Sequence, residues 1–235
     1  MAERFFFLVL AAVLAGCGGA PAGDTLFPLG DGHVWRYRLT TTIDDVADAP
    51  RHETLTLSTR GAENFDGHPA WRRHSDSGID YWLRSDDTGI YRVASKGPLD
   101  LEPTGDNPPR YVLRKPYAVG TQWEVLTTTY VLQRKNEVPR EIRHTQKPFP
   151  MVYRIEAIDQ KVETAAGRYE GCVRVAGKAQ IRLYVDAMFA WREVPLTATE
   201  WYCPQVGLVK VERSEPSPTK FMLGGTVTME LASWK

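Results

Sequence analysis

The chain has 235 residues, with 29 basic and 29 acidic side chains, so its formal net charge at pH 7 is zero. No basic stripe stands out along it, which argues against nucleic acid as a partner. Hydrophobic residues make up 43% of the sequence and include seven tryptophans, a composition that excludes a disordered protein and allows a substantial core.

The N-terminus has the layout of a secretory signal. Residues 1–4 are short and polar, residues 5–14 are an unbroken apolar run, and small residues lead to Cys17. The run is too short to cross a bilayer, which needs about twenty apolar residues. The alternative, a core strand or helix, conflicts with the small, flexible residues that follow. We predict a signal peptide over 1–16 and a flexible tether over 17–25.

Leu14-Ala15-Gly16-Cys17 resembles the lipobox of bacterial lipoproteins. The resemblance implies that Cys17 carries a diacylglyceryl group and, after cleavage, a further acyl chain such as palmitate on its amine. Two or more acyl chains give stable anchoring, so the membrane would be a partner through lipid. Position 18 is Gly, where the enterobacterial pattern places Asp for inner-membrane retention. The resemblance therefore implies the outer membrane, with the domain facing the periplasm.

Two other cysteines remain, Cys172 and Cys203. Outside the cytoplasm such a pair tends to form a disulfide, and the alternative is two buried free thiols. No Cys-x-x-Cys motif is present, which argues against a redox role.

The body of the chain alternates apolar and polar residues with period two, the pattern of half-buried strands. The expected strands number about eleven and lie at 34–39, 52–59, 79–84, 89–94, 123–132, 152–158, 172–176, 179–185, 197–202, 208–213 and 226–231. Helix signals are poor, and 185–194 fits no clean apolar stripe. Residues 96–110, with four prolines, predict a long loop, while 134–150 could be a loop or an extension of the flanking strands. We therefore predict an all-β, mainly antiparallel fold.

The two halves of the chain resemble one another. Trp35 and Trp123 each follow a proline and a turn glycine, and each opens a strand that continues into threonines. Gly67-His68 echoes Gly171-Cys172, and the Trp82 and Trp201 segments are each followed by a Gly-led strand. Chance matching among β-rich segments is the alternative. We predict half-repeats of about 26–110 and 111–235, two β-meanders packed as one open barrel or sandwich in a single 26–235 domain.

Three features together resemble a group of uncharacterised bacterial lipoproteins and periplasmic proteins. They are the lipobox, the Phe-Pro-Leu-x-x-Gly-x-x-Trp-x-Tyr opening at 27–37, and the Trp-Tyr-x-x-x-Val-Gly-Leu-Val stretch at 201–209. Some such proteins look like half-open β-barrels of the lipoprotein-carrier type, which hold an acyl chain in an apolar trough. This resemblance implies a carrier of lipid or another apolar ligand, although the chain shows no clear lid helices.

Sequence motifs for chemistry are missing. His68 and His74, near Asp76 and Asp80, form the nearest approach to a metal cluster, but solvated strand ends explain them more simply, and we expect no metal and no cofactor. No nucleophile elbow or pair of acids can be named. The tryptophans, by contrast, lie in or near expected strands. Core packing is their simplest role, and a ligand cleft is the sharper alternative, for which the candidates are Trp35, Trp82, Trp123 and Trp201.

These observations lead to an expectation of a non-catalytic binding or scaffolding protein, anchored in the cell envelope, with an apolar ligand or an envelope protein as its partner. One alternative is a periplasm-facing carrier of lipid or apolar ligands. The other is an envelope hydrolase whose catalytic residues converge only in the folded chain.

Overall fold

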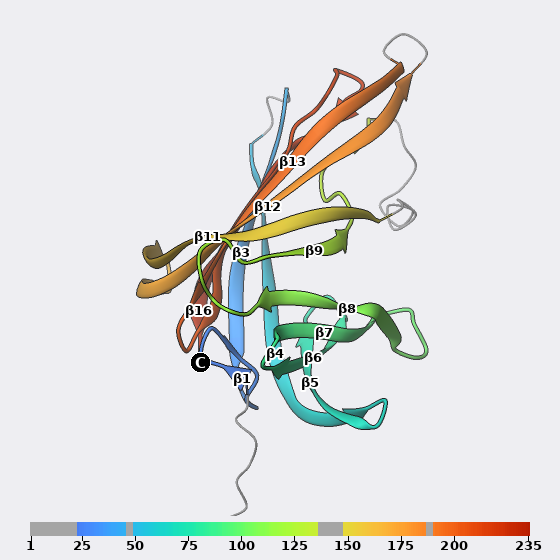
Figure 1. Cartoon of the computed structure of the whole chain (residues 1–235). Helices are drawn as coiled ribbons and strands as arrows, with labels where there is room; N and C mark the ends of the chain where they lie inside the picture. The colour runs from blue at the N-terminus through green and yellow to red at the C-terminus, as the bar shows by residue number, and fades with distance from the viewer. Residues whose placement is uncertain (1–22, 46–48, 136–147, 187–189) are drawn as a thin grey trace, which may run out of the picture.

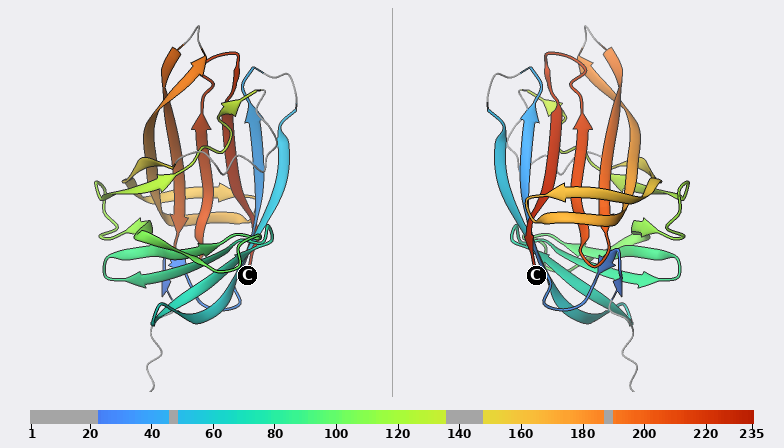
Figure 2. Two further views of the ribbon diagram at one scale, coloured as in Figure 1. Left: turned by 90° about the vertical axis from the view of Figure 1, so that its right-hand side faces the viewer. Right: turned by 90° about the vertical axis from the view of Figure 1, so that its left-hand side faces the viewer.

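The computed structural model describes residues 23–45, 49–135, 148–186 and 190–235, and Cys17 with the expected signal peptide lies outside them. Twelve antiparallel strands form one strongly bent sheet that is nearly closed as a barrel (Figures 1 and 2). The predicted all-β antiparallel class is confirmed. The strands are β3 (Val34–Ile43), β4 (Arg51–Phe65), β5 (His68–Ser75), β6 (Asp80–Asp86), β7 (Gly89–Lys96), β8 (Thr104–Arg114), β9 (Gln122–Thr127), β11 (Phe149–Thr164), β12 (Gly167–Asp186), β13 (Ala190–Cys203), β14 (Gly207–Glu215) and β16 (Gly225–Trp234).

The strand order is β8-β7-β6-β5-β4-β3-β16-β14-β13-β12-β11-β9, so the sheet consists of two meanders joined through β3 and β16. β3 to β8 form the first meander, and β9 to β16 form the second. Trp35 and Trp123 lie on the first strand of their respective meanders, and Gly89 and Gly207 open the fifth, both with positive φ. Gly67 and Gly171 differ in position, because Gly67 is in a turn and Gly171 lies inside β12.

The two meanders do not close the barrel on their other side. β8 and β9 lie next to each other, but no ladder of backbone hydrogen bonds joins them. At this unsealed seam, β8 and β9 are therefore the two edge strands of the sheet. Residues 104–110, expected to be loop, belong to β8, and Pro108 and Pro109 fall where its register with β7 shifts. Proline has no N–H to donate, so within sheets it is found at edges and bulges. The four prolines led us to expect a loop where the structure has an edge strand.

Several strands are longer than expected. Residues 172–176 and 179–185 are parts of one strand, β12, which pairs with β13 from Val173 to Asp186. Strand β9, in contrast, is shorter than expected, because it ends at Thr127 and the prediction extended to residue 132. Within the described ranges no helix is long and apolar enough to cross a membrane.

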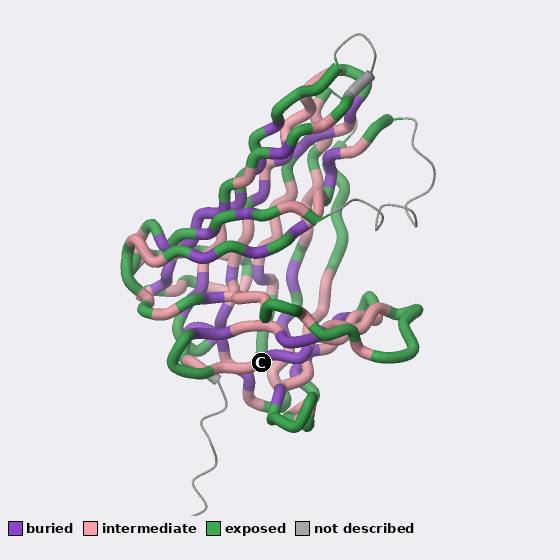
Figure 3. The backbone as a smooth tube through the Cα atoms, turned by 45° about the vertical axis from the view of Figure 1, so that its right-hand side comes forward, coloured by how far each residue is buried: buried purple, intermediate pink, exposed green. Residues whose placement is uncertain are grey.

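Side chains alternate between the barrel interior and solvent along most strands, as the burial colouring shows (Figure 3). The chain before β3 closes one end of the barrel. Gly23–Asp24 (β1) pairs with Phe27–Pro28 (β2), and Leu26, Phe27 and Leu29 are buried in the largest apolar cluster. Residues 23–25, which we expected in the tether, are therefore part of the folded domain.

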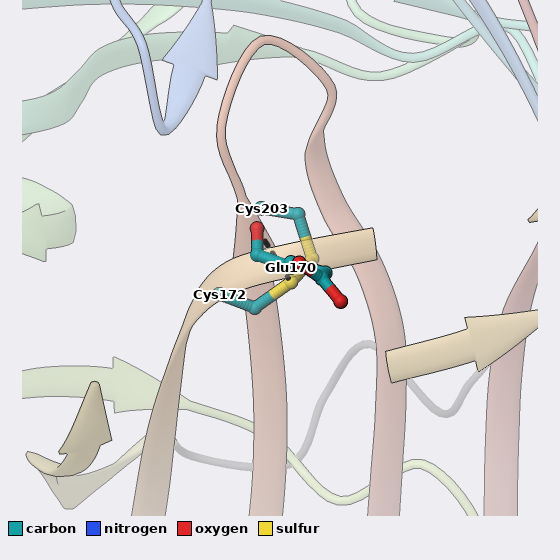
Figure 4. The surroundings of a disulfide bond; sticks show 3 residues. All are labelled: Glu170, Cys172 and Cys203. Atoms are coloured by element: carbon teal, nitrogen blue, oxygen red, sulfur yellow. Dashed lines mark hydrogen bonds between the residues drawn. A yellow bond between two sulfur atoms is a disulfide. The ribbon is translucent and has the colours of Figure 1, made fainter. Parts of the chain in front are cut away.

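The predicted disulfide between Cys172 and Cys203 is confirmed (Figure 4). The β12–β13 register pairs Val173 with Tyr202, which places the two cysteines directly opposite each other. Both cysteines are fully buried. The bond thus fastens two neighbouring core strands near the closed end, and the alternative of two free thiols is excluded.

Candidate functional site

A cavity of about 120 Å³ opens at the unsealed seam. Alternation along β9 turns Trp123 and Val125 inward and leaves Glu124 exposed. The β9–β11 register places Trp123 opposite Tyr153, and their rings stack with centroids 5.9 Å apart. Residues from four strands therefore meet here, and the cavity is lined by Arg110, Tyr111, Val112, Trp123, Val125, Tyr153, Glu200 and Tyr202.

The only carboxyl group among these lining residues belongs to Glu200. Glu200 and Tyr202 are two apart on β13 and so share a face, and Tyr202 Oη donates a 2.5 Å hydrogen bond to Glu200 Oε2. Burial raises the pKa of Glu200, while the hydrogen bond and the charges of Arg110 and Arg213 oppose that rise. Burial and the adjacent carboxyl raise the pKa of Tyr202 well above its usual range. Tyr202 therefore stays a hydrogen-bond donor at physiological pH.

Arg110 bridges the seam through its side chain. Its Nη1 donates a 2.8 Å hydrogen bond to the carbonyl of Leu126 on β9, where a backbone ladder would otherwise run. The ring of Trp123 lines the cavity, and its indole Nε1 is buried without a hydrogen-bond partner. Buried polar groups are normally paired, so this unpaired donor is an exception in the barrel interior.

A second polar arrangement lies nearby. Arg213 Nε and Glu215 Oε1 are 2.6 Å apart, and both side chains are almost fully buried. The Glu215 carboxylate also accepts hydrogen bonds from the backbone N–H groups of Tyr130, Val131 and Leu132. Arg213 donates to the carbonyl of Thr128. This ion pair therefore holds residues 128–132 against the end of β14.

The segment that this ion pair holds continues into β10 (Gln133–Arg134), which pairs with β15 (Met222–Leu223). One groove, of about 480 Å³, lies beside it and is lined by Thr129, Leu132, Gln133, Arg134, Pro148, Phe149, Gln180, Ile181, Arg182, Leu183, Tyr184 and Met222. Another, of about 450 Å³, is lined by Leu39, Thr41, Ile43, Arg51, Glu53, Tyr130, Val131, Gln133, Leu223 and Val227. Both grooves mix apolar and polar side chains.

A buried arginine supports the closed end. Arg73 lies over the rings of Phe27 and Trp35, at 4.3 and 4.2 Å from their centroids, and donates to the carbonyl of Pro28. Burial lowers the pKa of Arg73 to about 10, a value at which it remains charged at neutral pH. The side chain ties the chain before β3 to β5 through cation–π and hydrogen-bond contacts.

The four tryptophans considered for a ligand cleft lie in different places. Trp35 is buried and donates from Nε1 to the carbonyl of Val206. Trp82 is buried in a separate cluster, and its Nε1 donates to Glu63. Trp201 is partly exposed beneath the ammonium of Lys210. Only Trp123 of the four lines the seam cavity.

His74 forms a contact with Asp80, with Nδ1 and Oδ1 2.8 Å apart, and His68 is exposed at the start of β5. Across the described part of the chain, no group of three or more His, Cys, Asp or Glu side chains is placed to hold a metal ion.

Sequence reasoning missed Glu200, Tyr153 and Arg110. The one available signal was the position of Glu200 in the segment 197–202, where alternation places it on the inward face with Tyr202. Charged residues are seldom buried without a partner, so an acid at an inward position is a candidate site residue. Arg110 gave no signal, because the four prolines of residues 96–110 predicted a loop.

No protein-family model and no curated protein matches the chain. Two solved structures align with most of it. A "putative lipoprotein" from Parabacteroides distasonis ATCC 8503 has a TM-score of 0.40 at 12% identity, covering 90% of this chain and 98% of its own. A "putative exported protein with YmcC-like fold" from Bacteroides fragilis NCTC 9343 has a TM-score of 0.36 at 13% identity, covering 89% and 98%. At these scores the similarity assigns no function.

Proposed function

We propose that this chain is a lipid-anchored binding protein of the bacterial cell envelope, held in the outer membrane through Cys17, facing the periplasm and without a catalytic role. The N-terminal signal and lipobox support the location. The buried Cys172–Cys203 bond supports it as well, because disulfides persist in oxidising compartments. The first described strand, β1, lies at the opposite end from the β12–β13 hairpin (Figure 1), so the hairpin end would point away from the membrane.

The observation that carries the binding role is the cavity at the unsealed seam. It opens to solvent between two strand edges, has stacked aromatic rings as a wall, and is lined by the polar side chains of Arg110, Glu200 and Tyr202. A concave site with aromatic walls and a few convergent polar groups is typical of small-molecule binding. The single carboxyl of Glu200 supports binding over hydrolysis of glycosidic bonds, which generally needs two acids.

The location is tested by the intact mass of the protein extracted from membranes, with and without reduction and alkylation. We expect loss of residues 1–16, added acyl mass on Cys17, and alkylation of Cys172 and Cys203 only after reduction. A Cys17→Ala variant should lose the acyl mass and leave the membrane fraction. A full-length, unacylated protein in the cytosol would contradict the proposal.

The groove of about 480 Å³ favours a second candidate, carriage of an apolar ligand. Its floor is the apolar cluster of Leu132, Ile181 and Met222, with Phe149 and Leu183 packed against it. A fluorescent fatty acid should then bind, and Ile181→Asp should weaken that binding, while Val152→Asp, an exposed position on β11, should not. Equal binding by all three proteins would exclude the groove as the carrier site.

A further inference from the structure

We propose that the groove of about 480 Å³ beside β12 binds an amphiphilic anion, a hydrocarbon chain that ends in an acidic head such as a carboxylate. The proposal rests on the second candidate function, carriage of an apolar ligand in the same groove, and adds the charge of that ligand. Its basis is an exposed arginine that lines the groove, together with the apolar side chains beside it.

The groove runs along an edge of the sheet. The pairing of β12 with β11 stops at Lys178, while β12 continues beside β13 to Asp186, so the two strands extend past β11 as a hairpin (Figure 1). Successive side chains of a strand point to opposite faces, and a groove along an edge is open to both. Arg182 from one face of β12 and Leu183 from the other therefore line the same groove.

Arg182 supplies a cation that a ligand can reach. Its side chain is exposed, and its guanidinium carbon lies 5.2 Å from the centroid of the Trp191 ring. Among the residues that the structure describes, no hydrogen bond or ion pair to Arg182 is found. The cation–π contact holds the guanidinium in place, and the N–H groups of a guanidinium match the two oxygens of a carboxylate.

Trp201, on the same strand as Trp191, has an equivalent contact with a cation that already has partners. The Nζ atom of Lys210 lies 5.5 Å from the centroid of the Trp201 ring. The same ammonium group forms ion pairs with Glu212 and Glu230, at 2.8 and 3.3 Å. The lysine is therefore neutralised by the protein, whereas the arginine of the groove is left for a ligand.

The other polar groups of the groove also favour an anion over a cation. The lining includes a second arginine, Arg134, whose Nη2 donates a 2.7 Å hydrogen bond to the carbonyl of Tyr184. Among the described lining residues there is no carboxylate. The carboxylate of Glu193 adjoins the groove, but it accepts a 2.5 Å hydrogen bond from Gln180. A cationic ligand would therefore face two guanidinium groups.

Apolar side chains provide the place for the hydrocarbon chain. Phe149 and Leu183 are partly exposed, and they pack against the buried cluster that includes Leu132, Ile181 and Met222. Covering this surface with a hydrocarbon chain removes it from water, which a bare anion cannot do. The volume of the groove lies within the roughly 300–1,000 Å³ of small-molecule pockets.

The test uses the full lipoprotein in nanodiscs of phosphatidylcholine, with 5-fluorotryptophan in place of its seven tryptophans. Fluorine NMR then reports on each ring, and Trp191→Phe and Trp201→Phe assign the two resonances on β13. The probes are octanoate, 1-octanol, octyltrimethylammonium and acetate, each titrated separately. Empty nanodiscs measure how much of each probe the lipid takes up.

We expect octanoate to shift the Trp191 resonance saturably and to leave the Trp201 resonance unmoved. Octanoate should bind about tenfold or more tightly than 1-octanol, and Arg182→Gln should remove that difference, because it removes charge-assisted hydrogen bonds. Lys210→Gln is the matched control and should leave octanoate binding unchanged. The fold should tolerate both variants, because surface substitutions usually change stability little.

Equal binding of octanoate and 1-octanol would overturn the acidic head and leave the apolar carrier function standing. Tighter binding of octyltrimethylammonium than of octanoate would overturn the charge of the ligand. Acetate that binds as tightly as octanoate would overturn the hydrocarbon chain. No saturable shift with any probe would overturn both this proposal and the carrier function, while the acyl mass on Cys17 decides the location separately.

Discussion

The carboxylate of Glu215 pairs with the guanidinium of Arg213 at 2.6 Å in the interior, and the same carboxylate accepts hydrogen bonds from three consecutive backbone N–H groups. A surface ion pair contributes little to stability, but removing one partner of a buried pair leaves an unpaired charge. The segment 128–132 therefore depends on a side chain that lies more than eighty residues further along the chain.

Replacing Glu215 by Leu should lower the free energy of unfolding by about 3–5 kcal/mol, because Arg213 and three amide groups lose their partner together. Glu212→Gln is the matched control on the same strand, where the glutamate is half-exposed and pairs with Lys210. The control should change stability by less than about 0.5 kcal/mol. Urea denaturation followed by fluorescence measures both, and equal effects would refute the structural role of Glu215.

Opening the Cys172–Cys203 bond should destabilise the fold. The cysteines are 31 residues apart. Closing a loop of this length lowers the entropy of the unfolded chain, which raises the free energy of unfolding by about 3–4 kcal/mol on the chain-entropy model. The double variant Cys172→Ala/Cys203→Ala should show this loss in denaturant melts. Adding a reductant should lower the wild-type stability and leave the double variant unchanged. An unchanged wild type under complete reduction would show that the bond adds no stability.

Arg73→Ala should loosen the chain before β3, because it removes the cation–π contacts to Phe27 and Trp35 and the hydrogen bond to Pro28. We expect the free energy of unfolding to fall by about 2–4 kcal/mol. We also expect faster amide hydrogen exchange in residues 26–29. Arg72→Ala, at the neighbouring and partly exposed position, is the control. Unchanged exchange over 26–29 in Arg73→Ala would contradict the anchoring role.

Glu200 should make stability depend on pH. Burial raises its pKa in the folded protein above the value in the unfolded chain. The protonated form of Glu200 therefore contributes fully to the free energy of unfolding below the pKa of the unfolded state, near 4.5. This contribution is lost as the pH rises through the pKa of the folded state. Glu200→Gln removes this dependence, so its stability relative to the wild type should improve as pH rises from 4.5 toward 7. Parallel stability curves for the two proteins across that range would exclude a raised pKa.

Much of the fold was predictable from local pattern. Period-two alternation identified strands such as 89–94 and 208–213, and Gly89 and Gly207 marked where these strands begin, because these signals act between neighbours in sequence. Alternation was less useful for strand ends. Pro108 and Pro109 suggested a loop, because the sequence does not show which strand lies at an edge.

The sequence by itself predicted the antiparallel β class, because period-two alternation acts between neighbouring residues. It also favoured pairing of Cys172 with Cys203, because two spare cysteines in an exported chain tend to form a disulfide. Only the tertiary structure decided that Arg110, Trp123 and Glu200 meet at one cavity. Their meeting depends on how far the sheet curls before β8 reaches β9. That curl follows from the twist and register of all the strands together, which no single segment encodes.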